Sequence, residues 1–224
     1  YTVDLLGCGR SDKSSITYTN FVYVQMISDF IKKIIGQKTD VIASGFSGSF
    51  VTMACHNEKE LFNKIMLVNP PSLTQLKQMP NRKDRLLKAA LEIPIFGTLI
   101  YHMIVSRDNV NNLFIEKMYY NPFHVDNQMA DAYYEAAHKG GCYTRFLYSS
   151  LAAKYMNINI CHALKALDNS IYIVEGETEP NGKAVTDDYC ASNPAVEVSV
   201  LKETKHLPHV EAPEAFLEQV KIFF

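Results

Sequence analysis

The sequence predicts an α/β fold, in which a mostly parallel sheet is flanked by helices and interrupted by an inserted helical segment. Short β-rich apolar runs alternate with helical patterns in the first 70 residues, which is the rhythm of parallel strands joined by right-handed crossovers. The same rhythm resumes near residue 170, after a stretch of helical spacing. With 224 residues, the chain is long enough for one core and an insertion.

The first elements follow in order along the chain. Residues 3–6 are expected to form a short buried strand that ends at a glycine-containing turn. Residues 19–35 carry apolar side chains three and four positions apart, which predicts a helix, and Gly36 stands where such a helix would end. A second strand is expected at 40–44 and a third at 64–69, with a helical pattern between them.

The middle of the chain, from about residue 81 to residue 164, contains no comparable strand pattern. Several of its stretches carry helical spacing, which predicts an inserted helical lobe. Strand patterns then return at 170–176 and 197–201, with helices expected at 186–191 and 213–224. The chain therefore divides into a core of five strands, formed by residues 1–70 and 165–224, and a helical insertion of residues 71–164.

Composition excludes several classes of partner. Lys and Arg total 22 against 24 for Asp and Glu, so the net charge of −2 gives no basic surface for nucleic acid. The longest apolar stretches fall short of the roughly 20 residues that span a bilayer, so no membrane anchor is expected. The five cysteines are odd in number and widely spaced, which predicts reduced thiols in a cytoplasmic protein and no disulfide framework. We expect neither a metal nor a cofactor, because no usual ligand spacing is present.

The residues from Gly45 to Ser49, with the sequence GFSGS, lie at the junction of a β-rich run and a helix, where a nucleophile elbow would lie. Outside such a junction the same string is merely a turn. We predict Ser47 as the nucleophile, held in strained backbone geometry by the sharp turn, with small residues two positions before and after it. The Gly48 amide is the expected oxyanion donor, and Phe46 is expected to contact substrate.

A serine hydroxyl needs a base to take its proton and an acid to orient that base. His206 follows a strand and precedes a helix, in a loop that would return to the carboxyl edge of the sheet, and we predict it as the base in preference to His209. The loop after residues 170–176 offers four carboxylates, of which Glu179 is our choice; the others are Glu177, Asp187 and Asp188. The resulting chain order of serine, acid and histidine is that of α/β-hydrolases.

These motifs closely resemble the α/β-hydrolase superfamily, within it the lidded enzymes that include small esterases, C–C bond hydrolases and proline iminopeptidases. VDLLGCGRSDK is similar to the family's DxxGxGxS strand and loop, GFSGS to its elbow, GETEP to its acid loop and KHLPHVEAPEAF to its GHxPxxExP ending. The resemblance covers nearly the whole chain. It implies the roles already given to Ser47, Gly48, Glu179 and His206, and a cap formed by the helical insertion.

The chain departs from the family pattern at several points. Ser49 replaces the usual glycine, Lys205 replaces the glycine before the histidine, and Glu179 stands where aspartate is commoner. The family's strands upstream of VDLLG are not seen, nor is the loop that supplies its second oxyanion amide. Because Tyr1 opens directly into an apolar run, we expect the chain to be an N-terminally truncated fragment, a clipped product or the ordered part of a longer protein.

The leading functional prediction is a serine hydrolase that cleaves a small, largely apolar ester or related carbonyl substrate through an acyl-enzyme on Ser47. A serine at the elbow argues against haloalkane dehalogenases and epoxide hydrolases, which the resemblance associates with a carboxylate there. The alternative is a non-catalytic small-ligand-binding protein on the same scaffold. Acyl transfer to an acceptor other than water also stays open. The expected partner is a small-molecule substrate, and an exposed sheet edge makes a homo-oligomer possible.

Overall fold

The computed structural model describes residues 1–224, apart from the side chain of residue 127. The chain forms two compact units. The first comprises Tyr1–Tyr23, Gln78–Glu116 and Pro122–Asn157, and the second comprises Val24–Lys77, Lys117–Asn121 and Ile158–Phe224. Most of the expected insertion belongs to the first unit. A division into a core and a cap at residues 70 and 165 stays a prediction.

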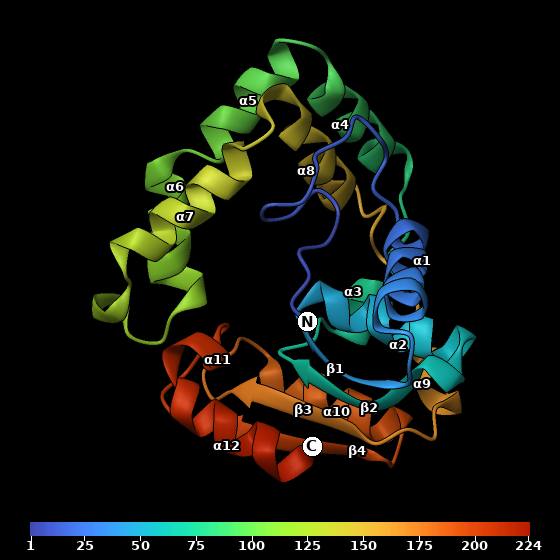
Figure 1. Cartoon of the computed structure of the whole chain (residues 1–224). Helices are drawn as coiled ribbons and strands as arrows, with labels where there is room; N and C mark the ends of the chain where they lie inside the picture. The colour runs from blue at the N-terminus through green and yellow to red at the C-terminus, as the bar shows by residue number, and fades with distance from the viewer. The chain divides into compact units, whose positions relative to one another are not determined.

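The second unit is built on a parallel sheet, which Figure 1 shows with its strands in chain order. Each strand pairs in parallel with the next, and the order across the sheet is β1-β2-β3-β4. The bounds are Thr39–Ser44 for β1, Phe62–Val68 for β2, Ile171–Gly176 for β3 and Val196–Leu201 for β4. This sheet and its flanking helices confirm the α/β fold predicted from the alternating pattern.

Helices cover both faces of this sheet, which explains why β2 and β3 are almost continuously apolar. On one face, helix α12 (Pro213–Phe223) packs its apolar side chains against a buried cluster of Met66, Tyr172, Val174 and Leu201. Helices α2 (Phe46–Asn57) and α10 (Gly182–Ser192) also pack against the strands, and α9 (Cys161–Ala166) packs against these two helices. The unit also contains the short helices α3 (Leu73–Leu76) and α11 (Pro208–Glu211) and a 3-10 turn at Lys59–Leu61.

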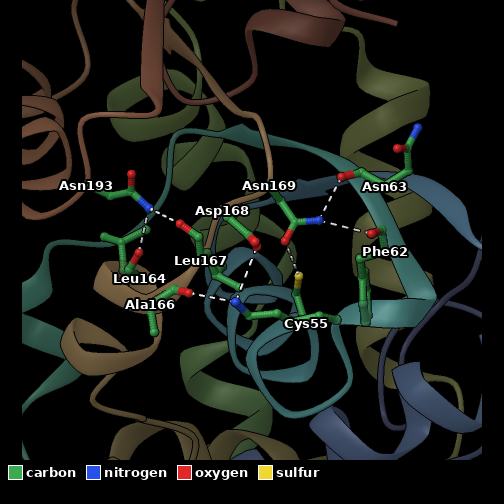
Figure 2. A network of polar contacts seen from close by, with 10 residues as sticks. Cys55, Phe62, Asn63, Leu164, Ala166, Leu167, Asp168, Asn169 and Asn193 are labelled. Atoms are coloured by element: carbon green, nitrogen blue, oxygen red, sulfur yellow. Dashed lines mark hydrogen bonds and ion pairs between the residues drawn. The ribbon is translucent and has the colours of Figure 1, made fainter.

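A polar network, drawn in Figure 2, fixes the amino ends of β2 and β3. Asn169, just before β3, donates from Nδ2 to the carbonyls of Phe62 and Asn63 at 3.0 and 2.8 Å. Its Oδ1 accepts from the Cys55 thiol at 3.4 Å. Asn193 caps the loop before β3 by donating to the carbonyls of Leu164 and Leu167. The bonds of Asn169 tie together segments more than a hundred residues apart in the sequence.

The described residues of the first unit contain helices and turns but no strand, as the sequence predicted for the middle of the chain. Its helices are α4 (Arg82–Glu92), α5 (Phe96–Ile104), α6 (Arg107–Leu113), α7 (Asn127–His138) and α8 (Thr144–Ala152), with 3-10 turns at Pro122–His124 and Gly141–Tyr143. Buried polar groups join them: the Arg145 guanidinium donates to the Glu92 carbonyl, and the Ser149 hydroxyl donates to the Glu92 carboxylate at 2.7 Å.

Helix α1 (Asn20–Phe30) continues as a π-helical segment over Ile31–Ile35 and ends at Gly36. Gly36 takes a φ of 72°, and its amide donates to the Ile31 carbonyl at 2.7 Å. A left-handed glycine after the last turn is a common helix ending, so the predicted end at Gly36 is confirmed. A second π-helical segment spans Phe114–Met118.

The strand predicted at residues 3–6 is wrong, and the sheet has four strands in the described chain instead of five. The polar groups of this segment bind within a turn: the Asp4 carboxylate accepts from the Arg10 amide at 2.9 Å, and the Leu5 carbonyl accepts from the Cys8 amide. Val3 is 42% exposed. An apolar segment forms a strand only when another strand lies beside it to share hydrogen bonds. The apolar pattern of residues 3–6 does not show whether such a neighbour exists.

Among the described residues, no single helix is long and apolar enough to cross a membrane. The neighbouring helices α4 and α5 meet the length and composition criteria only as a pair, and the pair is bent by 100°.

Candidate active site

Gly45 is the single residue between β1 and α2, and it turns the chain from strand to helix. Its φ of 57° and ψ of −131° lie where an L side chain is strained and glycine is not. A nucleophile elbow places this strain on the turn residue itself. The sequence predicted that Ser47 would carry the strained geometry; this is corrected, because the strand ends at Ser44 and the turn follows at once.

Ser47 lies in the first turn of α2, after the sharp bend. Its hydroxyl donates to the Ser44 carbonyl at 2.7 Å, a local bond that holds the side chain against the end of the strand. Ser49 is fully buried, and its hydroxyl donates to the Phe46 carbonyl at 2.7 Å. Both serine hydroxyls therefore donate to main-chain carbonyls at the start of the helix.

Gly48, the expected oxyanion donor, is buried in the same helical turn. Its amide donates to the Gly45 carbonyl at 3.1 Å, so this N–H is already used within the turn. The first amides of a helix have no acceptor inside the helix, and Phe46 is the first residue of α2. In a nucleophile elbow the oxyanion donor is the amide of the residue after the turn residue. With Gly45 as the turn residue, that donor is the Phe46 amide and not the Gly48 amide predicted from the sequence.

The predicted acid and base lie next to each other. His206, in the loop between β4 and α11, has its Nδ1 at 3.0 Å from Oε1 of Glu179, in the loop between β3 and α10. The two side chains are 33% and 20% exposed, so solvent reaches the pair only in part. A carboxylate on Nδ1 favours the tautomer whose Nε2 accepts a proton.

The alternative acid and base occupy other environments. Glu177 accepts from the Glu203 amide at 2.9 Å, which holds its carboxylate in the turn after β4. His209 packs against Phe216 with ring centroids 5.8 Å apart, and burial, with a smaller effect of His206, lowers the pKa of His209. The geometry thus distinguishes Glu179 and His206 from Glu177 and His209.

Asn69, which the sequence analysis gave no role, holds the histidine loop in position. It follows β2, is 5% exposed and has a φ of 43°. Its Nδ2 donates to the carbonyls of Lys205 and His206 at 2.8 and 2.9 Å, while its Oδ1 accepts from the Gly176 amide at 3.0 Å. Lys205 takes part through its main chain, and its amide donates to Glu211 at 2.7 Å. The only feature of the sequence that could have indicated this role is that Asn69 is a polar residue at the carboxyl end of a buried strand.

A cavity of about 520 Å³ lies at this edge of the sheet, within the second unit. Gly45, Phe46, Glu179 and His206 all line it, whereas Ser47 is not among the described lining residues. The other walls come from the segment after β2, from β3 and from α10 with the loop before it, namely Asn69, Pro70, Pro71, Ser72, Thr74, Gln75, Glu175, Pro180, Asn181, Gly182, Ala184, Val185, Thr186 and Asp188.

Glu175 adds a second carboxyl group to the cavity wall. It is 5% exposed, and its Oε2 is buried without a hydrogen-bond partner among the described residues. Burial raises its pKa, and the nearby charges of Glu179 and Asp187 act in the same direction. Glu175 therefore favours its neutral form more than an exposed glutamate does.

The class of the molecule follows from these features: a parallel sheet carries a strand-to-helix elbow and a histidine–carboxylate pair at its carboxyl edge, which is the plan of an α/β-hydrolase fold. The chain belongs to the alpha/beta hydrolase family, whose family model matches residues 1–219. No curated protein matches the sequence.

Several solved structures share the fold. A 2-hydroxy-6-oxo-6-phenylhexa-2,4-dienoate hydrolase from a Rhodococcus strain superposes with a TM-score of 0.74 at 16% identity, covering 99% of this chain and 78% of that one. A meta-cleavage product hydrolase mutant from Pseudomonas fluorescens gives 0.72 at 17% identity, covering 99% and 77%. A thermophilic esterase from Thermogutta terrifontis gives 0.72 at 11% identity, covering 98% and 76%. At these identities the likeness concerns the fold alone.

Proposed function

We propose that this protein hydrolyses a small ester or related carbonyl compound in the cavity, with His206 as general base and Glu179 as the acid that orients it. One observation carries the proposal: the bonded Glu179–His206 pair lines the same cavity as the elbow residue Gly45. Perturbed or paired ionisable groups at the wall of a concave site are the usual mark of acid–base chemistry.

Each group has a chemical task in this proposal. His206 takes a proton from the attacking oxygen through Nε2, and the Glu179 carboxylate stabilises the imidazolium that forms. The amide of Phe46, at the positive end of α2, donates to the oxygen on which negative charge develops. A cavity of about 520 Å³ suits a small molecule, and the side chain of Phe46 offers an apolar contact within it.

Ser47 stays a candidate nucleophile for the acyl-enzyme route expected from the sequence. For that route its hydroxyl would have to leave the Ser44 carbonyl and reach the His206 side of the elbow. The proposal of hydrolysis itself does not depend on this route, because His206 can deprotonate either a serine or a water molecule.

The test measures kcat/KM of the wild type and of two histidine variants on a panel of chromogenic carboxylic esters of increasing acyl length. His206→Ala should lower kcat/KM by about 10²- to 10⁴-fold, because general base catalysis is lost. His209→Ala, three residues further on in α11, is the matched control and should lose far less, once its thermal unfolding shows that it is folded. Equal losses in the two variants would contradict the assignment of the base.

A second candidate function is binding of a small ligand without turnover. It is favoured by the glycine at the elbow and by the engagement of the Ser47 hydroxyl with the backbone. In that case a ligand should raise the melting temperature while no ester in the panel is consumed by the wild-type chain.

The remaining expectations are proposals about context. The partner is a small molecule, and self-association remains to be tested by sizing. The cytoplasm suits the five free cysteines, which lie at positions 8, 55, 142, 161 and 190.

A further inference from the structure

The strand-to-helix turn of this chain has its apex at Gly45, two residues before the predicted nucleophile. A turn of this kind needs small residues two positions before and after the apex, where side chains would collide. Around Gly45 these residues are Ala43 and Ser47, and Ala43 is 5% exposed. Ser47 thus fits the steric requirement that follows the apex, and its hydroxyl is bonded to the Ser44 carbonyl.

The volume above Gly45 belongs to the cavity. A Cβ added to Gly45 would meet no heavy atom within 4 Å, so the place of a nucleophile's side chain is open to whatever fills the cavity. The same cavity is lined by His206, whose Nδ1 is bonded to Glu179. Its Nε2 is the ring atom that can accept a proton from a molecule in the cavity.

We infer that a water molecule takes the place of the nucleophilic side chain above Gly45, so that hydrolysis proceeds in one displacement without an acyl-enzyme. The inference rests on the proposed hydrolytic function and specifies its nucleophile.

The reaction balances with the groups present. The water oxygen attacks the carbonyl carbon and forms the new C–O bond, while one of its protons passes to Nε2 of His206. The carbonyl electron pair moves to its oxygen, which the Phe46 amide stabilises. The pair then returns, the bond to the leaving alcohol oxygen breaks, and His206 gives its proton to that oxygen. One ester and one water become one carboxylic acid and one alcohol, and His206 is restored.

The position of the apex is tested with a fluorophosphonate probe and mapping of the modified residue. Gly45→Ser supplies a hydroxyl at the apex, and Gly45→Ala is the matched control with the same backbone strain and no hydroxyl. We expect no adduct in the wild-type chain or in Gly45→Ala, and an adduct on residue 45 in Gly45→Ser that is lost on adding His206→Ala. An adduct on Ser47 in the wild-type chain overturns the inference, as does a folded Gly45→Ser chain that is not modified at residue 45.

The absence of a covalent intermediate is tested on the wild-type chain, which needs no variant to fold. The chain is mixed with 4-nitrophenyl butyrate, quenched with acid during steady turnover and weighed by mass spectrometry. We expect turnover that depends on His206 and a chain of unmodified mass. Turnover with an acyl adduct overturns the inference but leaves the hydrolytic function standing. No turnover of any ester in the panel overturns both, and the labelling of Gly45→Ser still reports whether residue 45 is the apex.

Discussion

The side-chain amide of Asn69 donates a hydrogen bond of 2.9 Å to the main-chain carbonyl of His206. Through the same side chain, the end of β2 is joined to Lys205 and to Gly176 at the end of β3. The loop that carries the proposed base is therefore fixed by main-chain contacts, which do not depend on the identity of the residue before the histidine. This explains how lysine can stand at position 205, where glycine is usual in the family resembled.

Asn69→Ala should lower both the stability and the turnover of the chain. The substitution removes the acceptor of the buried Gly176 amide and the donor to the carbonyls of Lys205 and His206, and an unsatisfied buried group costs about 1–3 kcal/mol. Alanine also tolerates the φ of 43° less well than asparagine. Denaturant unfolding and kcat/KM should be measured together. The matched control is Asn63→Ala, which removes an exposed bond to Asp40 and should change both quantities little. Equal effects of the two variants would contradict a positioning role for Asn69.

Glu179→Gln should lower kcat by much more than Glu177→Gln. Glutamine keeps the shape of the side chain but removes the negative charge that stabilises a protonated His206, whereas the Glu177 carboxylate accepts from the Glu203 amide. The two variants lie in one loop and change the net charge equally, so a long-range electrostatic effect would move both alike. A larger loss in Glu177→Gln would transfer the acid role to that residue.

Most of the fold could be predicted from periodicity. The sheet strands and the helix that ends at Gly36 carry patterns that burial on one or both sides imposes on the sequence. The segment at residues 3–6 has a similar apolar pattern, yet its polar groups close a turn around Asp4. A run of four residues does not tell which other strand could pair with it, and pairing decides whether a strand forms.

The elbow shows a different limit of prediction. Two overlapping strings satisfy the same steric rule, one centred on Ser47 and the other on Gly45. Residue chemistry favours Ser47, because only serine has a nucleophilic hydroxyl, whereas the backbone takes the bend at Gly45. Which of the two residues takes the turn depends on where β1 ends, and this is set by its pairing with β2. The sequence around the elbow does not contain that information. The histidine–glutamate pair could be predicted because each partner follows a strand end, where parallel strands bring loops together.

Asn169→Ala should destabilise the chain without a specific effect on chemistry. Asn169 joins the amino ends of β2 and β3 through Phe62 and Asn63 (Figure 2). His206 follows the carboxyl end of β4, at the other end of the parallel strands. Loss of these bonds should cost about 1–3 kcal/mol in unfolding free energy. The kcat of the remaining folded protein should stay within about twofold of the wild type, since the cavity is untouched. A large fall in kcat at full folding would show that the two edges are coupled.

Glu175→Gln should change how stability depends on pH. The pKa of Glu175 is raised in the folded chain, chiefly by burial, so the folded state holds this proton at pH values where the unfolded state has released it. The contribution of Glu175 to the free energy of unfolding is fully present below the ordinary glutamate pKa. It is lost as the pH rises through the raised pKa of the folded state. The wild-type unfolding free energy should therefore fall over this interval relative to the variant, and the variant should be the more stable of the two at neutral pH. Denaturant unfolding from pH 4 to pH 8 measures the difference, with Glu177→Gln as an exposed control. Parallel curves for wild type and Glu175→Gln would mean that burial does not hold a proton on this carboxyl.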